Sequence, residues 1–125
     1  MHQVLIALGS NDHQNAHIQW ASERLSCLLC DIQLSRKLWT QDIHATGQWY
    51  MNRLAAGYTT LSVDAISQKL KETEREAGRT PKRVSLDLDL MLYDNERFHL
   101  RDWPRPYIQQ LLPDIKQFIF YEETD

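Results

Sequence analysis

The sequence predicts an α+β protein of the ferredoxin-like βαββαβ arrangement, an antiparallel sheet with two helices on one face, followed by a short C-terminal helix. Two observations predict it. Four short segments have the patterns of strands, and two longer segments have apolar residues at helical spacing. The chain has 125 residues, of which 42% are hydrophobic, which is enough for one core. We therefore expect residues 1–125 to form a single domain.

The first half of the chain has the patterns of a strand, a helix and a second strand. The apolar run Val4–Gly9 is typical of a buried strand, and the turn residues Gly9–Asp12 follow it. Apolar residues then recur at helical spacing, which predicts a helix over His13–Cys30. Alternation returns in Asp31–Trp39, which predicts the second strand, and Thr40–Gln48 is expected to be a polar loop.

The third strand and the second helix come next. The strand is expected over Trp49–Thr60, with an interruption at Gly57. Ser62 is a suitable N-cap for the helix, and Gly78 stands where a left-handed residue ends one. The expected apolar face of this helix consists of Ile66, Leu70, Thr73 and Ala77.

The segment SLDLDLML, Ser85 to Leu92, predicts the fourth strand and contains two aspartates. Its leucines alternate with Asp87, Asp89, Met91 and Tyr93, so we expect one face to be all leucine and both carboxylates to point the other way. Residues i and i+2 on one face of a strand lie about 6.5–7 Å apart. Two carboxylates at that separation can flank a shared site.

The remaining elements follow the aspartate strand. Asp94–Glu96 predicts a turn, Trp103-Pro104 is expected to open a short helix that ends at Leu112, and Phe118–Tyr121 is a candidate last strand. Within the sheet, we expect the first strand to lie beside the third and the fourth strand beside the second.

Charge and composition limit the classes of function. The net charge of −3 argues against a nucleic-acid or anionic-membrane surface, and Val4–Leu8 lacks the aromatic residues with which RNA-recognition modules of this topology stack bases. That run is also too short to span a membrane and has no leader pattern before it, so we expect a cytoplasmic protein. Cys27 and Cys30 form a single CxxC without further metal ligands nearby, and we interpret both as buried helix cysteines.

Basic residues gather directly before the aspartate strand. Lys69–Arg83 holds six basic and three acidic residues, a balance of +3, so the rest of the chain carries −6. Asp87 and Asp89 could hold Mg²⁺, which prefers carboxylates, waters and substrate phosphates. Arg79, Lys82 and Arg83 could neutralise a polyphosphate. The chain has no GxxxxGK[ST], which excludes a P-loop enzyme. Without further support, a DxD on an open strand face is more often only solvated.

Four motifs supply further support. They are IALGSN (Ile6 to Asn11), YMN (Tyr50 to Asn52), ETEREAGR (Glu72 to Arg79) and LDLDLMLYD (Leu86 to Asp94). In this order they resemble the 6-hydroxymethyl-7,8-dihydropterin pyrophosphokinase family of the folate pathway. The resemblance implies a ferredoxin-like fold. It also implies transfer of a pyrophosphoryl group from ATP to the hydroxymethyl group of a reduced pterin, with AMP as product and two Mg²⁺ ions at the triphosphate.

The resemblance also implies roles for single residues. Asp87 and Asp89 would hold the two Mg²⁺ ions. Arg79 would approach the triphosphate, and together with Arg83 it is a candidate catalytic arginine. Arg79, Lys82 and Arg83 are the candidate contacts of ATP.

Three further residues match the pterin pocket of the family. Tyr50 and Asn52 match its Tyr-x-Asn, and the amide of Asn52 can both donate to and accept from a pterin edge. Thr40 matches a pocket threonine. We therefore take Thr40, Tyr50 and Asn52 as candidate pterin-binding residues.

The chain departs from the family pattern at three places. Only Thr80–Ser85 separates Arg79 from the aspartate strand, where the family has a long closing loop, and Arg83 lies one residue upstream of the family's second catalytic arginine. The Pro-Pro of the family's pterin loop is absent from Thr40–Gln48. After Asp94 the chain has HLRDWPRPYIQQLL in place of the family's Val-Pro-His and Arg-x-Phe motifs.

These departures define the alternative function, a catalytically degenerate relative that binds a pterin or a nucleotide. The family's C-terminal portion is also largely missing. A homodimer is a possible partner arrangement, because a second subunit could cover the apolar surface left there.

Overall fold

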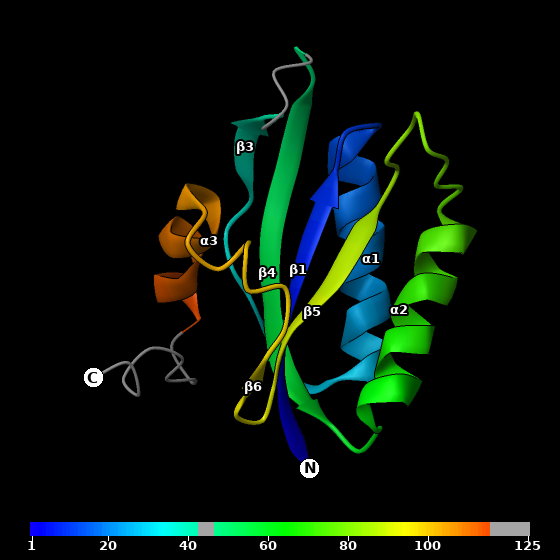
Figure 1. Ribbon diagram of the computed structural model, residues 1–125. Helices are drawn as coiled ribbons and strands as arrows, with labels where there is room; N and C mark the ends of the chain where they lie inside the picture. The colour runs from blue at the N-terminus through cyan, green and yellow to red at the C-terminus, as the bar shows by residue number, and fades with distance from the viewer. Residues whose placement is uncertain (43–46, 116–125) are drawn as a thin grey trace.

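The computed structural model describes residues 1–42 and 47–115, and it contains a six-stranded antiparallel sheet with helices on both faces (Figure 1). The strand order is β2-β4-β1-β5-β6, and β3 also pairs with β4. The strands are β1 (His2–Ser10), β2 (Cys30–Leu34), β3 (Leu38–Gln41), β4 (Trp49–Thr59), β5 (Asp87–Tyr93) and β6 (Glu96–Arg97). The helices are α1 (Gln14–Leu28), α2 (Val63–Glu76), α3 (Pro106–Leu111) and the 3-10 turn η1 (Leu112–Asp114). The predicted α+β arrangement is confirmed.

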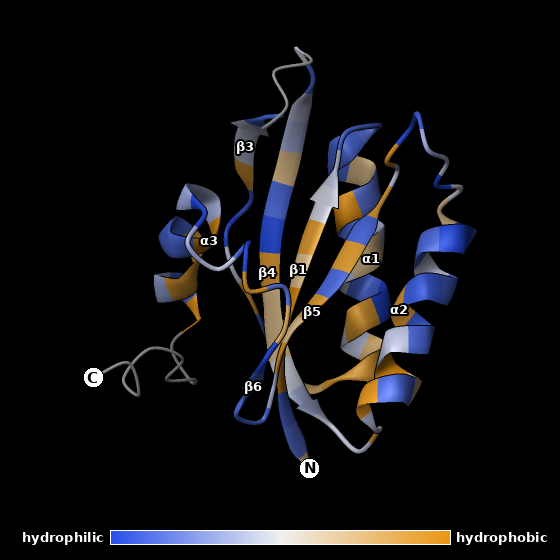
Figure 2. Cartoon of the chain, in the orientation of Figure 1, coloured by the Kyte–Doolittle hydropathy of each residue, from blue (hydrophilic) through white to orange (hydrophobic). Residues whose placement is uncertain are grey.

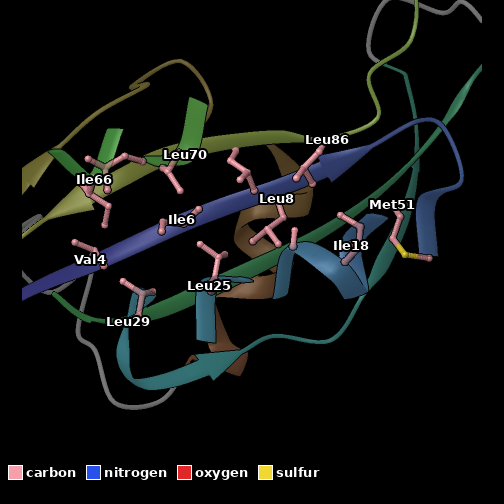
Figure 3. Close-up of a cluster of buried hydrophobic side chains, with 14 residues drawn as sticks. Val4, Ile6, Leu8, Ile18, Leu25, Leu29, Met51, Ile66, Leu70 and Leu86 are labelled. Atoms are coloured by element: carbon pink, nitrogen blue, oxygen red, sulfur yellow. The ribbon is translucent and has the colours of Figure 1, made fainter. Parts of the chain in front are cut away.

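One face of the sheet packs against α1 and α2. The side chains of Val4, Ile6 and Leu8 point from β1 toward the two helices, where they meet a layer of buried apolar side chains (Figure 3). Members of this layer from α1 and α2 include Ile18, Leu25, Ile66 and Leu70, and Leu29 joins it directly after α1. The sides of α1 and α2 that face away from this layer are mostly hydrophilic (Figure 2). Burial of this face is the main stabilising contribution to the fold.

The opposite face of the sheet is only partly covered, by α3 and η1 (Figure 1). Leu5 and Leu54 pack there against Trp103, Ile108 and Leu111. Beyond this second cluster, toward the end of β1 that leads into α1, the sheet face carries polar side chains instead of apolar ones. The candidate site lies there.

The predicted neighbour of the aspartate strand was wrong. β5 pairs with β1, whereas the second edge of β4 is taken by β2 and β3. Every strand has only two hydrogen-bonding edges, and both edges of β4 are occupied. The free edge of β1 therefore remained for β5. This pairing sets Asp87 opposite Gly9 and Asp89 opposite Ala7.

A β-bulge changes the facing of β5 near its end. Leu5 pairs with Leu92 and Ile6 pairs with Leu90, so Met91 is an additional residue on β5. Met91 and Leu92 both pack under α3, whereas Leu90 packs against the α1 and α2 side. The prediction of one all-leucine face was therefore wrong at Leu92. The two aspartates precede the bulge and keep the predicted facing.

The predicted strand Asp31–Trp39 is in fact two strands, β2 and β3. Between them the backbone N–H of Ser35 donates to the carbonyl of Leu54, and the Oγ of Ser35 accepts the N–H of Leu54 at 2.8 Å. A hydroxyl thus replaces a backbone carbonyl in the ladder, and the chain leaves the regular strand path. Thr40, expected in a loop, belongs to β3 and pairs with Tyr50.

The interpretation of Cys27 and Cys30 as buried helix cysteines was wrong, because both are exposed. The buried residues of α1 are Ile18, Ala21, Ser22 and Leu25. Cys27 does not lie on that stripe, and Cys30 is the first residue of β2 because α1 ends at Leu28.

The C-terminal helix begins later than predicted. Pro106, not Pro104, stands in the first turn of α3, where a residue without an N–H is tolerated. Trp103 is instead buried in the second cluster, and its indole N–H donates to the carbonyl of Phe98 at 3.0 Å. The candidate strand Phe118–Tyr121 lies outside the described residues.

Other local predictions are confirmed. The Oγ of Ser62 accepts the N–H of Ala65 at 3.1 Å, which caps α2. Gly78 has a φ of 82° directly after that helix. In the segment Asp94–Glu96, Asp94 and Asn95 form the turn that leads from β5 into β6, which begins at Glu96. Among the described residues, no helix has the length and apolar content that a membrane span requires.

Gly57→Ala is expected to destabilise the fold by about 1–3 kcal/mol. A Cβ at this position would lie 2.9 Å from the carbonyl oxygen of Cys30 and 3.0 Å from the Cβ of Leu29, so backbone would have to shift. Gly9→Ala is the matched control in the same sheet, because its nearest contact would be 3.4 Å, to Asn52. Urea unfolding of both variants measures the difference, and equal stability of the two would contradict the expectation.

Candidate functional site

The candidate site begins with a row of residues across three strands. Asp87 of β5 lies opposite Gly9 of β1, which lies opposite Asn52 of β4, and Asp89 lies opposite Ala7 one step along. Since side chains directly opposite one another share a face, the carboxylates and the amide stand on the same side of the sheet. Gly9 and Ala7 are small, and they form the floor of a cavity of about 400 Å³ between the two polar groups.

The predicted pterin-binding residues all line this first cavity. Thr40, Tyr50 and Asn52 lie on β3 and β4. The amide nitrogen of Asn52 donates to the Oγ of Thr40 at 2.6 Å, and the hydroxyl of Tyr50 accepts from the amide of Asn11 at 3.2 Å. These bonds hold the polar side chains in fixed orientations at the cavity wall.

The opposite wall of the first cavity comes from α3 and the residues before it. Arg105, Pro106, Tyr107 and Gln110 line it. Burial raises the pKa of Tyr107 to about 12, so its ring presents a neutral phenol to the cavity. A cavity of this size, bounded by two tyrosines and a few fixed polar groups, suits a small planar molecule.

A second cavity of about 350 Å³ lies on the other side of the carboxylates. α2 contributes Lys71 and Glu74, and the segments after α2 and β6 contribute Arg79 and His99. Asp87 and Asp89 line both cavities. The two carboxylates therefore stand at the boundary between a cavity walled by tyrosine and amide side chains and a cavity that contains the cations Lys71 and Arg79.

Arg79 is the cation held at the carboxylates. Its Nη1 lies 2.7 Å from Oδ1 of Asp87 and 3.3 Å from Oε2 of Glu74. Burial lowers the pKa of Arg79, but the carboxylates of Asp87 and Glu74 outweigh that effect and raise it. Glu74 in turn accepts the backbone N–H of Leu88 at 2.7 Å, which satisfies the open edge of β5. Burial raises the pKa of Glu74.

Asp89 carries the strongest electrostatic perturbation of the site. Burial, and next to it the carboxylate of Asp87, raise the pKa of Asp89 to about 7. The charged form of Asp89 is therefore disfavoured here unless positive charge is added beyond that of Arg79. A hard divalent cation with oxygen ligands fits this donor set, because Mg²⁺ needs only one or two protein carboxylates.

The other predicted ATP contacts lie elsewhere. The Nε of Arg83 is 3.8 Å from a carboxylate oxygen of Asp12, and Lys82 is exposed. Neither residue lines the two cavities. Thr80 and Arg83 exchange backbone hydrogen bonds of 3.0 and 3.2 Å, so the short loop closes on itself.

Several lining residues were not predicted from the sequence. Asp102, Arg105, Tyr107 and Gln110 lie far from the motifs, and no spacing in the segment marks them as a cavity wall. Lys71 and Glu74 are in the basic stretch that the sequence did single out. Both lie on the side of α2 that faces β5, and the helical spacing of that side is the sequence signal that could have indicated them.

The fold and the site together define an α+β protein of ferredoxin-like arrangement whose sheet carries a candidate two-carboxylate cation site between two cavities. In the comparison with protein-family models, residues 5–117 match the model of 7,8-dihydro-6-hydroxymethylpterin-pyrophosphokinase (HPPK). The chain therefore belongs to this family, whose members are pyrophosphokinases of folate biosynthesis that use ATP, a pterin and Mg²⁺. The comparison with curated proteins gives no significant match.

Proposed function

We propose that the chain transfers a pyrophosphoryl group from ATP to 6-hydroxymethyl-7,8-dihydropterin. The observation that carries this proposal is the position of Asp87 and Asp89 at the boundary of two cavities. A reaction between a planar heterocycle and a polyphosphate needs one compartment for each, with a cation site where they meet. Family membership supports the same reaction.

The first cavity would take the pterin. Asn52 and Thr40 offer an amide and a hydroxyl to the polar edge of the heterocycle, and the tyrosine rings bound its faces. This orientation would bring the hydroxymethyl group toward the carboxylates. Because Gly9 and Ala7 form the floor and carry no bulky side chain, the ring has room to lie close to the sheet.

The second cavity would take the triphosphate. Asp87 and Asp89 would hold two Mg²⁺ ions, which supply positive charge to the phosphate oxygens and help to align them. Arg79 and Lys71 are the cations of this cavity, and we propose both as phosphate contacts. Arg79 would exchange its contact with Asp87 for one with the phosphate.

The reaction needs no covalent intermediate with the protein. The oxygen of the hydroxymethyl group forms a bond to the β-phosphorus, and the bond from that phosphorus to the oxygen bridging it to the α-phosphorus breaks. AMP leaves with the bridging oxygen, and the hydroxyl proton passes to solvent. The protein contributes by positioning both substrates and by neutralising charge, as in other phosphoryl transfers.

The alternative is a relative that binds a pterin or a nucleotide without turnover. The observation that favours it is the short loop Thr80–Ser85, within which Thr80 and Arg83 are joined by hydrogen bonds. In this loop Arg83 lies beside Asp12 and not in either cavity. A loop that does not reach the cavities excludes little water from the carboxylates.

One assay separates the two functions. Purified protein is incubated with ATP, Mg²⁺ and 6-hydroxymethyl-7,8-dihydropterin, and AMP is measured with and without the pterin. The proposed function requires AMP that appears only when the pterin is present. Binding of either ligand by calorimetry without AMP formation would establish the alternative, and absence of binding of both ligands would exclude both functions.

Asn52→Ala is expected to weaken pterin binding by at least about tenfold, because two or more hydrogen bonds in a buried position are lost. The affinity for a non-hydrolysable ATP analogue with Mg²⁺ should stay unchanged, since Asn52 lines only the first cavity. Calorimetric titration with the pterin, after saturation with the analogue, measures the effect. Asn15→Ala is the matched control, because Asn15 is exposed and bonds to Lys37 outside the site. Equal losses in both variants would exclude a specific role of Asn52.

A further inference from the structure

We propose that Asp89, His99 and Asp102 form a binding site for a divalent transition metal ion of the Mn²⁺ type. The site shares Asp89 with the proposed magnesium site, but its other two ligands come from the segment after β6. It goes beyond the proposed function, because it requires neither nucleotide nor pterin. Its failure and the failure of the transfer reaction are therefore separate results.

The distances among the three side chains fit a shared ion. One ligand atom from each residue lies within 4.8 Å of the other two, and the Nε2 of His99 is 3.8 Å from Oδ1 of Asp89. That separation is too long for a hydrogen bond. Two atoms that each bind one ion at about 2.0–2.2 Å are at most about 4.4 Å apart. The pair therefore already lies at a spacing suited to a common ion, and the ligand atom of Asp102 lies within 4.8 Å of both, so it needs at most a small approach to join them.

Neighbouring contacts hold the ligands in place before an ion binds. The N–H of Asp102 donates to the carbonyl of His99 at 2.8 Å, which links the two ligands through a turn. The Nε of Arg105 donates to Oδ1 of Asp102 at 2.7 Å and orients that carboxylate. The buried Trp103 anchors the segment to the sheet face. Outer contacts of this kind are typical of metal sites, where they fix the direction of each ligand.

The charges of the surroundings favour a cation. Asp89 shares the second cavity with the carboxylates of Asp87 and Glu74, and a carboxylate oxygen of Asp102 lies within 4.8 Å of the ligand atom of Asp89. Arg79 is bonded to Asp87 and Glu74, and Arg105 is bonded to Asp102. In the part of the chain that the structure describes, Asp89 faces the ring of His99, which is charged only when protonated. A divalent ion would compensate the remaining charge.

The imidazole decides which kind of ion the site prefers. Mg²⁺ favours oxygen ligands, whereas imidazole nitrogen is a good ligand for first-row transition metals. Two carboxylates and one imidazole suit Mn²⁺ and its neighbours, which accept both donor types. The site should therefore bind Mn²⁺ more tightly than Mg²⁺, and the difference should depend on His99.

The test uses Mn²⁺ as the probe on the full-length, nucleotide-free protein. Electron paramagnetic resonance of free Mn²⁺ measures affinity, and electron spin-echo modulation detects a ¹⁴N nucleus bound to the ion. We expect ¹⁴N modulation in the wild type. His99→Asn should abolish this modulation and weaken Mn²⁺ binding at least about tenfold. The reason is that removal of a direct ligand lowers metal affinity more than removal of an outer contact does. Asp102→Asn should weaken Mn²⁺ binding. At Mn²⁺ concentrations that saturate this variant, the ¹⁴N modulation should remain.

A matched control exists at the start of α1. His13 is exposed and has a φ of 44°, close to the 54° of His99, so His13→Asn makes the same change on the same type of backbone. His13→Asn should leave affinity and modulation as in the wild type. Modulation that is absent from the wild type, or that survives in His99→Asn, or that His13→Asn also removes, would overturn the proposal.

Asp87→Asn separates this site from the proposed reaction. It leaves all three ligands in place, so ¹⁴N modulation should persist while AMP formation is lost. Wild-type protein with modulation but without pterin-dependent AMP would contradict the transfer reaction alone. Wild-type protein that forms AMP but has no modulation would contradict the transition-metal site alone.

Discussion

Asp89→Asn is expected to abolish Mg²⁺-dependent AMP formation and, in the same protein, to stabilise the metal-free fold. The loss of activity should be about 10³-fold or more, because a ligand of the proposed catalytic ion is worth several kcal/mol of transition-state stabilisation. The gain in stability follows from the burial of Asp89 and, next to it, from the neighbouring carboxylates, which together disfavour its charged form. A neutral amide of the same shape removes both penalties without removing atoms.

The gain should depend on pH with a defined sign. The pKa of Asp89 is about 7 in the folded protein and 3.8 ordinarily, so the fold favours the protonated form. The stability that this proton contributes is fully present below pH 3.8 and is lost as the pH rises through about 7. Asp89→Asn should therefore match the wild type near pH 4 and exceed it at pH 8. We expect a difference on the order of 1 kcal/mol or more, one pKa unit being worth about 1.4 kcal/mol.

Urea unfolding of metal-free protein at pH 4, 6 and 8 measures this dependence. Glu23→Gln is the control for loss of a carboxylate, because Glu23 is exposed on α1 and lies outside both cavities. Its stability relative to the wild type should not increase with pH. An Asp89→Asn protein that is less stable than the wild type at pH 8 would show that the Asp89 carboxylate is structurally required and would contradict the electrostatic account.

Arg79→Gln is expected to lower the turnover number for AMP formation by about 10²–10³-fold, the usual loss when a donor to transition-state charge is removed. The same variant should bind Mg²⁺ at least as tightly as the wild type when no nucleotide is present. The reason is that Arg79 lies 2.7 Å from Asp87 and competes with a metal ion for that carboxylate. Opposite changes in turnover and in metal affinity distinguish a phosphate-binding role from a structural one.

Single-turnover assays and Mg²⁺ titration by calorimetry test this prediction. Arg75→Gln is the matched control, because Arg75 lies four residues before Arg79 in the last turn of α2, is exposed and lines neither cavity. It should change neither quantity. If Arg79→Gln lost metal binding together with turnover, Arg79 would be needed to build the carboxylate site, and its assignment to the triphosphate would fall.

Local patterns in the sequence predicted those features that depend on neighbouring residues. Ser62 caps α2 and Gly78 follows it, because a cap needs only a side chain or a backbone angle at one position. Asp87 and Asp89 face one side of β5, since alternation is a property of a single strand. The motif YMN likewise put Tyr50 and Asn52 on one face of β4.

Features that depend on pairing between distant segments were not predicted. Ser35 ends β2 because its hydroxyl meets Leu54, and the bulge at Met91 arises in the register between β5 and β1. Neither partner is visible from the local pattern. The position of Arg83 near Asp12 likewise depends on a distant segment, while its role at a phosphate stays a prediction.

The sequence by itself determined the class of fold, the strand that carries the carboxylates and the motifs of the pyrophosphokinase family. Periodicity and short motifs encode these, because they act over a few residues. The tertiary structure alone decided that β5 lies beside β1, that α3 supplies the second wall of the first cavity, and that His99 and Asp102 approach Asp89. These contacts depend on which hydrogen-bonding edges and apolar faces remain free once the sheet has formed, and no single segment contains that information.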